Sequence, residues 1–492
     1  MGLIKHSIAF SVATFISRAV GYVRDALIAY YFGVSSITDA FFVAFRLPNT
    51  FRRLFGEGGF NAAFVPIYAK NTKEGKEKEF LQSTFTYYLL INLFTTLLLV
   101  LFAEQIISLI APGIKAKSYF DLAVFMGKWI FLYLFFVGLS AFFMAVLNTK
   151  GVFFVPAFAQ AVFNAVFSLT ITVGSNSLGY YSLIAGVLVG GLFQLLFHVF
   201  FLKGAPIGIS FKRHSDVKLL LKRLLPALMG FGIAQLSFFI DTFLASFLAL
   251  GSISYLYYAN RIFQLPLGAI SVGMANSLLS ALSHGEDKTK STTLALRFIL
   301  LLSFPAVVGL LVFAEQIVEL LYGRGMFLEN DVKVVGMVLQ AYSLGLVFFS
   351  LQKALSSVFF ARGDTFTPVK ASFWGIIFEG LTAYLYAFVL KLGVIGLALG
   401  TASSSVFSFA YLLKKTYKII DWRDIFSGMV KIVFASLLMG WFGFTLKGIS
   451  LLISIPACAL AYFAVLLLLR EKLLILALAY GNRLTKKHKG VL

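Results

Sequence analysis

Charged side chains interrupt apolar stretches in the N-terminal part of this 492-residue sequence. A charged side chain at the centre of a membrane helix costs about 2.5–3.5 kcal/mol on insertion scales, so each of these residues needs a physical reason. A guanidinium carries a planar fork of donors that binds phosphate or carboxylate through two hydrogen bonds. The pattern therefore predicts a binding site for an anionic ligand, and the candidate residues are Arg18, Arg24, Asp25, Asp39, Arg52 and Arg53.

Two simpler interpretations stay open for these residues. Arg52 and Arg53, together with Glu57, could lie near a membrane interface and extend their charged ends to the headgroups. Arg24 and Asp25 are adjacent and could form a purely structural ion pair within a span.

Arg261 lies in the apolar stretch YYANRIFQLP and has no acidic residue nearby in its own segment. An arginine in such a position is predicted to face a wet cavity, where its guanidinium suits a bidentate oxyanion such as phosphate or carboxylate. The alternative is that it pairs with a buried structural partner on another helix.

Isolated acidic residues mark the second half of the chain. Asp241 and Glu379 each stand alone in an apolar segment, and Thr401 begins a run of hydroxyl side chains in a third segment. Oxygen ligands from three helices could hold a hard cation, or a carboxylate could carry a proton. Small hydroxyl residues also serve helix packing, so the hydroxyl run alone is a weak signal.

The chain carries little that could catalyse a reaction. Its five histidines are scattered over span ends, loops and the tail, and it has one cysteine, Cys458. No HExxH, Walker A or GxSxG motif is present. A membrane enzyme would need a carboxylate cluster for metal or acid–base chemistry, which the mixed Asp and Arg pairs do not supply. We predict that the chain is not an enzyme and has no organic cofactor.

The segments that carry these residues are predicted to be membrane-spanning helices. The chain is 60% hydrophobic and 13% charged, with mean hydropathy +0.90, whereas soluble domains carry about 25% charged residues. Backbone groups must be satisfied internally in lipid, so an all-α polytopic membrane protein follows. About 20 residues cross the bilayer, and on that length we predict fourteen transmembrane helices near 7–32, 36–60, 80–103, 120–147, 153–174, 180–202, 218–250, 253–282, 293–314, 333–360, 368–390, 394–414, 425–446 and 449–469.

The distribution of basic residues predicts the orientation. Of the net charge of +21, much lies in the alternate loops 66–79, 203–223, 284–297, 361–370 and 414–423 and in the tail 471–492. Basic loops face the cytoplasm, so both termini are expected there. This explains the charge without nucleic-acid binding, and the tail is expected to contact anionic membrane lipids.

The sequence also contains an internal repeat. The pentapeptide FAEQI occurs at 102–106 and again at 313–317, and near the same offset Arg46 corresponds to Arg261 and Gly186 and Gly190 to Gly396 and Gly400. Two bundles of six helices follow, 1–210 and 216–424, in the same orientation. We expect a V-shaped pair around a central cavity that works by alternating access. The two helices of 425–470 lie outside the repeat, and we predict that they form a lipid-tail groove.

The stretches 17–33 (SRAVGYVRDALIAYYFG), 38–68 (TDAFFVAFRLPNTFRRLFGEGGFNAAFVPIY) and 257–268 (YYANRIFQLPLG) resemble the MurJ (MviN) family of lipid II flippases in the MOP superfamily. The resemblance implies export of lipid II, an undecaprenyl-pyrophosphate-linked disaccharide peptide, from the inner to the outer leaflet of the bacterial cytoplasmic membrane for peptidoglycan synthesis. It also implies that the important cavity charges are Arg18, Arg24, Asp25, Asp39, Arg52 and Arg261. A family sodium site would correspond to Asp241, Glu379 and Thr401 with the backbone of Leu397.

Two departures make the coupling ion less secure than the substrate class. An asparagine ligand of the family would fall on Gly375 here, and Glu379 replaces a shorter aspartate. Sodium, a proton and the membrane potential therefore all stay open, and we expect a monomer. The rival functions are export of another polyprenyl-pyrophosphate-linked glycan and multidrug cation antiport, although a cavity rich in arginine repels organic cations. A scaffold protein would not need arginine within the membrane.

Overall fold

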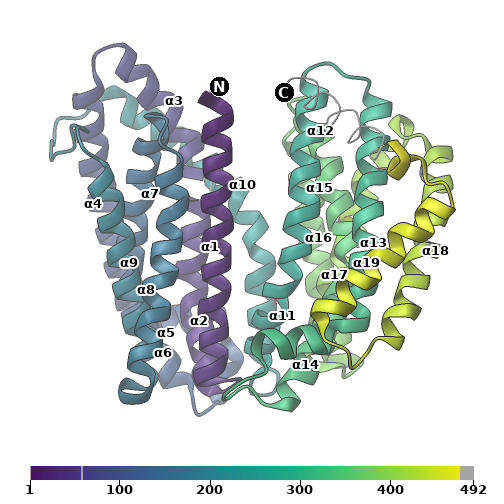
Figure 1. Cartoon of the computed structure of the whole chain (residues 1–492). Helices are drawn as coiled ribbons and strands as arrows, with labels where there is room; N and C mark the ends of the chain where they lie inside the picture. The colour runs from purple at the N-terminus through teal and green to yellow at the C-terminus, as the bar shows by residue number, and fades with distance from the viewer. Residues whose placement is uncertain (1, 57–58, 477–492) are drawn as a thin grey trace, which may run out of the picture. The chain divides into compact units, whose positions relative to one another are not determined.

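The computed structural model describes residues 2–56 and 59–476. All secondary-structure elements among these residues are helices (Figure 1). Glu57 and the part of the predicted basic tail beyond residue 476 lie outside the described residues. By packing, the chain divides into two compact units, Met1–Ser254 with Tyr322–Leu328 and Tyr255–Leu321 with Glu329–Leu492. This division describes contacts, and the repeat boundaries 1–210 and 216–424 stay a prediction.

The first unit is built from long helices that lie side by side (Figure 1). α8 packs against both α1 and α9, α2 against α6, and α3 against α7 and α10. The elements are α1 (Gly2–Phe32), α2 (Ser36–Phe51), the π-helical turn η1 (Arg52–Gly56), α3 (Gly59–Lys73), α4 (Glu77–Leu101), α5 (Ala103–Ile110), η2 (Pro112–Ala116), α6 (Phe120–Ile130), α7 (Tyr133–Thr149), α8 (Phe154–Leu178), α9 (Tyr181–Phe201) and α10 (Ser215–Ala245).

The second unit repeats this style of packing. α17 contacts α14, α15 and α16, while α18 pairs with α19. Its elements are α11 (Ser252–Leu267), whose first residues belong to the first unit, η3 (Gly268–Val272), α12 (Gly273–Ser283), α13 (Lys288–Tyr322), α14 (Glu329–Ser343), α15 (Leu346–Phe360), α16 (Phe366–Tyr384), η4 (Leu385–Val389), α17 (Gly393–Thr416), η5 (Tyr417–Ile419), α18 (Trp422–Thr445) and α19 (Leu451–Leu468).

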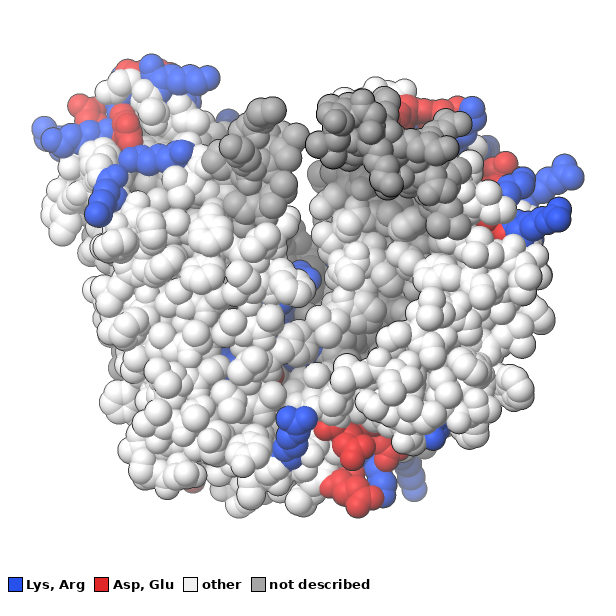
Figure 2. All heavy atoms as spheres, in the orientation of Figure 1, with Lys and Arg blue, Asp and Glu red and all other residues white. Residues whose placement is uncertain are grey.

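Every segment for which the sequence predicts a span contains one helix or consecutive helices, although α10 ends at Ala245, before the end of the predicted span 218–250. Within the described residues, ten helices are long and apolar enough to cross a membrane, or eleven if the bent pair α14 and α15 forms one span. The all-helical polytopic fold is therefore confirmed, whereas the number fourteen stays a prediction. Figure 2 shows charged side chains gathered at the ends of the visible faces, with long uncharged surfaces between them.

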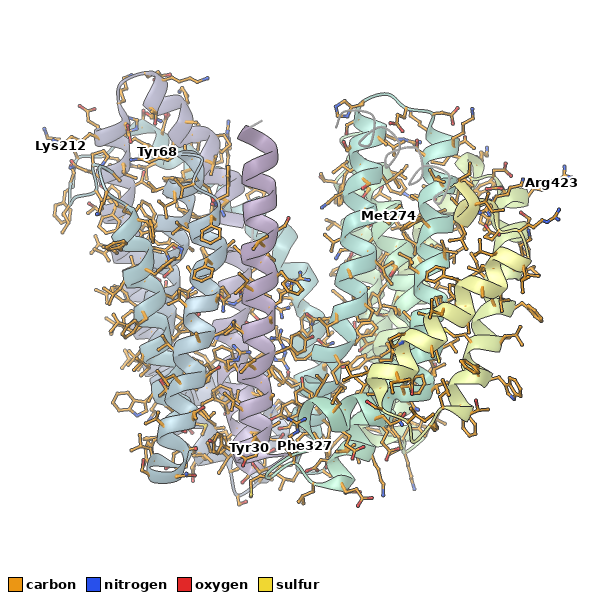
Figure 3. The ribbon with its side chains drawn as sticks, viewed as in Figure 1. Tyr30, Tyr68, Lys212, Met274, Phe327 and Arg423 are labelled. Atoms are coloured by element: carbon orange, nitrogen blue, oxygen red, sulfur yellow. The ribbon has the colours of Figure 1, made fainter. Side chains whose placement is uncertain are left out.

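Two glycines allow the segment 322–328 to join the first unit. The Met326 N–H donates to the Tyr30 carbonyl oxygen at 2.8 Å, and Figure 3 shows Tyr30 and Phe327 together at one end. Gly33 and Gly325 have φ of +58° and +66°. A Cβ on Gly33 would lie 2.2 Å from the Met326 oxygen, and one on Gly325 would lie 2.3 Å from the Tyr30 oxygen. Only glycine satisfies both the left-handed backbone and this close approach.

The helix that carries Arg52 and Arg53 changes its winding. Ser35 and Thr38 start α2 with a reciprocal capping box. α2 continues through Pro48 until the π-helical turn η1 begins at Arg52. Proline removes one N–H donor from the ladder, and a π turn close behind it re-aims the following side chains.

A polar contact joins α3 to the start of α10. The Asn71 side-chain amide donates to an Asp216 carboxylate oxygen at 2.9 Å, and the Lys70 ammonium lies 3.6 Å from the same oxygen. The Asn71 hydrogen bond, helped by the positive charge of Lys70, holds the pKa of Asp216 below its ordinary value.

Glycine pairs spaced by four residues close two helix–helix interfaces. A Cβ on Gly186 of α9 would lie 2.1 Å from the Phe167 ring of α8. In the second unit, a Cβ on Gly400 of α17 would lie 2.6 Å from the backbone of Ala383 on α16. Small residues at such interfaces let the helix backbones approach closely, which drives association in membranes.

Replacing Gly400 by alanine is expected to destabilise the protein by about 1–3 kcal/mol, because the added methyl group overpacks a rigid backbone contact. The matched control is Gly309→Ala on α13, where a Cβ would meet nothing within 4 Å. Thermal unfolding in detergent checks this. Equal midpoints for the two variants would contradict the packing argument.

Candidate functional site: charged groups within the helices

Arg24 is the centre of a buried polar cluster in the first unit. Its Nε and Nη2 donate to Asp25 Oδ1 at 3.0 and 2.6 Å, and its Nη1 donates to Asn164 Oδ1 at 3.0 Å. The Asn164 amide in turn donates to the Ser17 carbonyl oxygen at 3.3 Å. The guanidinium carbon lies 5.6 Å from the centre of the Phe167 ring, within cation–π range. The cluster ties α1 to α8.

Asp25 is completely buried and Arg24 is 6% exposed. Such a pair is stable only when each charge is matched, since an uncompensated buried charge is costly. The structural pairing that the sequence left open is therefore present. Whether Arg24 also binds substrate stays a prediction.

Asp39 has the contacts of a helix cap. One carboxylate oxygen accepts from the Ser254 N–H at 2.9 Å and the Ser254 hydroxyl at 2.6 Å, and the other accepts from the Gly251 N–H at 2.7 Å. Gly251 and Ser254 lie at the start of α11, where backbone N–H groups lack helical partners. Asp39 is 1% exposed. Its position in the first turn of α2 thus fixes the start of another helix, and its predicted cavity role stays a prediction.

Arg52 and Arg53 lie together in η1 and are half-buried. The Arg52 Nε donates to Asn49 Oδ1 at 3.3 Å and its Nη1 to Gln160 Oε1 at 3.4 Å. The Arg53 Nη1 donates to Gln235 Oε1 at 3.4 Å, and its guanidinium lies 5.0 Å from the Phe238 ring centre. These contacts with amides and a ring orient both guanidinium groups.

The two remaining predicted cationic residues, Arg18 and Arg261, are more exposed than Arg24. Arg18 is exposed on α1, next to Ser17 of the Arg24 cluster. Arg261 belongs to the second unit and is half-buried on α11. The structure thus brings Arg24, Asp25, Arg52 and Arg53 into one unit and places Arg261 in the other.

A second polar cluster connects α16 and α17. The Thr401 hydroxyl donates to Glu379 Oε1 at 3.1 Å and also lies 3.3 Å from the Leu397 carbonyl oxygen. Glu379 is 1% exposed. Three of the four predicted cation ligands therefore lie together. The fourth, Asp241, is buried in the first unit.

The geometry around Gly375 explains why an amide ligand is missing there. A Cβ on Gly375 would lie 2.1 Å from the Ser408 hydroxyl oxygen. The Ser408 side chain, which lies 3.2 Å from the Ala371 carbonyl oxygen, occupies that volume. The donor set in this unit is one carboxylate, one hydroxyl and one carbonyl oxygen, which are the oxygen ligands that hard cations take. Among the described residues, no group of three or more His, Cys, Asp or Glu side chains is placed to hold a metal ion.

The amide partners of the arginines and one buried ion cluster were not predicted from the sequence. Gln160 and Asn164 are four residues apart on α8 and therefore lie on one face of an apolar span. Two amides in this arrangement could have predicted the partners of the arginines. Arg297 on α13 binds Asp424 and Glu471 and is 3% exposed. The position of Arg297 inside the predicted span 293–314 could have predicted that this arginine needs acidic partners.

A protein-family model and the relatives of known sequence point to the same family. The family model described as lipid II flippase MurJ matches residues 28–482. A protein of Aquifex aeolicus (strain VF5) named probable lipid II flippase MurJ is 42% identical over 486 residues and covers 97% of each chain. A protein of the same name from Buchnera aphidicola subsp. Acyrthosiphon pisum (strain APS) is 33% identical over 458 residues, with 89% of each chain covered.

Solved structures agree with these relatives. One described as lipid II flippase MurJ in an inward closed conformation has a TM-score of 0.84 at 30% identity and covers 93% of this chain and 98% of its own. An inward-facing multidrug resistance MATE transporter of the MOP superfamily has a TM-score of 0.70 at 16% identity, covering 82% and 94%. The second likeness concerns the fold alone. The chain therefore belongs to the MurJ family of lipid II flippases, a family of multi-pass membrane transporters rather than enzymes.

Proposed function

We propose that the protein moves lipid II from the inner to the outer leaflet of the cytoplasmic membrane by alternating access. The observation that carries the proposal is the pair of half-buried guanidinium groups of Arg52 and Arg53, which contact amides and an aromatic ring within the helices. A pyrophosphate needs cationic partners of this kind. The family to which the chain belongs is named for the transport of the same lipid.

The finer organisation is part of the proposal. Fourteen helices cross the membrane, twelve as two repeated bundles and two as an addition, with both termini in the cytoplasm and the chain acting as a monomer. The charge pattern of the loops supports this orientation. Export of another polyprenyl-pyrophosphate-linked glycan is the second candidate, because the same cationic groups would bind its pyrophosphate.

A depletion strain tests the function. Loss of the protein should leave lipid II at the inner leaflet, measured as reduced access of an external probe to the precursor, and plasmid-borne wild type should restore access. Arg52→Ala and Arg261→Ala should fail to restore it, whereas the lysine variants should restore it partly, because an ammonium lacks the planar fork. Normal lipid II exposure in depleted cells, with another glycan lipid retained inside, would identify the second candidate instead.

The helices α18 and α19 are proposed to hold the prenyl tail. Both present large apolar side chains outward, including Trp441 at 72% and Leu452 at 81% exposure. A polyprenyl phosphate with a photoreactive tail should label these helices in membranes. Labelling confined to other helices would contradict the proposed groove.

We further propose that sodium binds at Glu379, Thr401 and the Leu397 carbonyl, with Asp241 contributing in one conformational state, and that it biases the transport equilibrium. An ion shifts such an equilibrium only through its different affinity for the two states. The contacts among Glu379, Thr401 and Leu397 support this site. A proton on Glu379 is the alternative carrier.

A sodium titration of conformation at fixed pH, followed by a distance probe, tests this site. Wild type should respond to sodium, and Asp241→Ala and Thr401→Ala should shift the midpoint at least tenfold or abolish the response. Serine in place of Thr401 is the matched control because it keeps the hydroxyl ligand. A response of equal midpoint in all four proteins would place sodium elsewhere, and a response to pH alone would favour the proton.

A further inference from the structure

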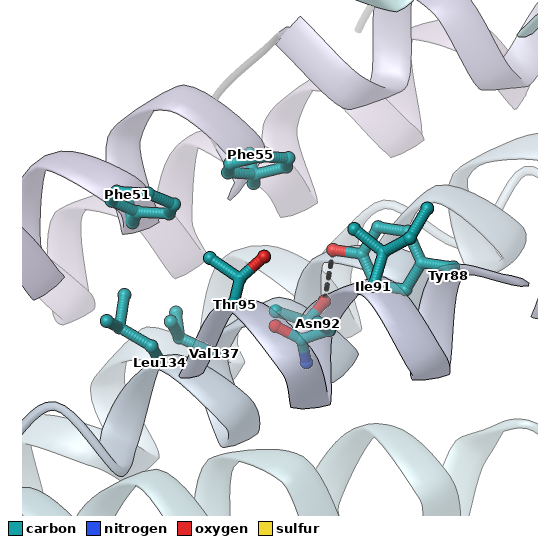
Figure 4. Close-up of a pocket in the computed structure, with 9 residues that line it drawn as sticks. Phe51, Phe55, Tyr88, Ile91, Asn92, Thr95, Leu134 and Val137 are labelled. Carbon is teal, nitrogen blue, oxygen red and sulfur yellow. Dashed lines mark hydrogen bonds between the residues drawn. The ribbon is translucent and has the colours of Figure 1, made fainter. Parts of the chain in front are cut away.

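A cavity of about 60 Å³ lies in the first unit between the end of α2 with η1, α4 and α7 (Figure 4). Figure 4 shows the rings of Phe51 and Phe55 on one side and Thr95, Leu134 and Val137 on the other. The two rings stack with centroids 5.6 Å apart and planes 17° apart. The cavity is separate from the Arg24 and Glu379 clusters, none of whose residues line it.

Two of the three polar side chains that line this cavity, Tyr88 and Asn92, are hydrogen-bonded to the protein. The Tyr88 hydroxyl donates to the Gly138 carbonyl oxygen at 2.9 Å, and the Asn92 amide donates to the Phe135 carbonyl oxygen at 3.0 Å. A water molecule would need two to four polar partners to be held here. With these groups already bonded and most of the lining apolar, the cavity suits hydrocarbon better than water or a polar ligand.

The cavity opens toward the lipid-facing side of α4. Ile91 lines it and is 52% exposed, and its neighbours Phe94 and Leu97 are 64% and 49% exposed. α4 has the length and hydropathy of a membrane span. The opening is therefore continuous with the surface that contacts the hydrocarbon of the bilayer.

We propose that this cavity is a binding site for the end of one acyl chain of a bilayer phospholipid. The volume equals roughly two water-sized groups, which limits the occupant to the last few carbons of a slender chain. A phospholipid chain is unbranched at its end, and it is already present at the opening. The chain end packs beneath Phe51, which precedes Arg52, and Phe55, which follows Arg52 three residues later.

Photocrosslinking in lipid nanodiscs tests the proposal with the full-length protein. The nanodiscs contain phosphatidylethanolamine and phosphatidylglycerol, with a trace of phosphatidylglycerol that carries a diazirine at the end of one acyl chain. Mass spectrometry of digested protein should find labels concentrated at 88–95 and 134–138. In Ile91→Trp, whose indole fills the opening, this labelling should fall at least tenfold.

Leu98→Trp is the matched control, because Leu98 lies seven residues further on the same exposed face of α4 and does not line the cavity. It should leave the labelling unchanged. Thr95→Phe, one helical turn from Ile91 on α4, also narrows the cavity and is a second blocking variant if Ile91→Trp does not fold. The proposal is overturned if the blocking variants label like wild type, if labels spread evenly along α4, or if a diazirine-tailed polyprenyl phosphate labels the cavity more strongly than the phospholipid does.

Discussion

Alanine in place of Arg24 is expected to abolish complementation of a depletion strain and to lower stability by about 3–5 kcal/mol. The reason for the second effect is local. Asp25, which is completely buried, loses the two hydrogen bonds from the guanidinium, and Asn164 loses its donor from α1. The first effect follows from the proposed role of the guanidinium toward the substrate pyrophosphate. Complementation and thermal unfolding in detergent measure the two effects separately.

A second variant separates the structural role of Arg24 from a substrate role. Replacing Arg24 and Asp25 together by alanine removes both charges, so no buried carboxylate is left uncompensated, and stability should recover in part. Export should stay lost if Arg24 binds substrate. Recovery of both stability and export in the double variant would show that the ion pair is structural only.

Asp25→Ala alone completes the comparison, because it leaves the arginine without its carboxylate. We expect it to be less stable than the double variant, since a buried guanidinium then lacks its counter-charge. The interaction energy from this double-mutant cycle reports the pairing itself.

The helices could be predicted from the sequence because hydropathy over about 20 residues is a local property. Each predicted segment contains one helix or consecutive helices, and the ends follow local signals such as Gly33 after α1 and Ser35 before α2. The winding of η1 was less predictable. Pro48 lies within α2, but the π turn begins only at Arg52, because the packing of neighbouring helices decides where the helical hydrogen bonds change.

The contacts of the charged residues could be predicted only in part. The contact between Arg24 and Asp25 can be predicted because the two residues are adjacent in the sequence. Asn164 is remote from Arg24 in the sequence, and its contact with Arg24 depends on the packing of α8 against α1. Asp39 was assigned to a cavity as one of the charges within apolar stretches and by the family resemblance. Its partners are two backbone N–H groups and the Ser254 hydroxyl at the start of α11, which are remote in the sequence, so no local pattern reveals them.

The same limit applied to Arg297, whose partners are Asp424, the last residue of the predicted repeat, and Glu471, which lies beyond it. Its Nη1 donates to Asp424 Oδ1 at 2.6 Å at the start of α18, and its Nη2 binds Glu471, which follows α19. A Cβ on Gly428 of α18 would lie 2.8 Å from the guanidinium, so the approach depends on glycine. Asp421 and Tyr462 add hydrogen bonds from these same segments to α13. The arginine therefore holds both added helices to the rest of the second unit.

Arg297→Ala is expected to lower stability by about 3–5 kcal/mol, because Glu471, 1% exposed, would keep a buried charge without a partner. The matched control is Lys333→Ala, which breaks an exposed pair with Glu329 and should leave the unfolding midpoint nearly unchanged. Thermal unfolding in detergent compares the two variants. Adding Glu471→Gln to Arg297→Ala should recover part of the loss, because the amide removes the buried charge. Equal unfolding of Arg297→Ala and Lys333→Ala would mean that the ion cluster does not anchor α18 and α19, and that apolar packing alone holds them.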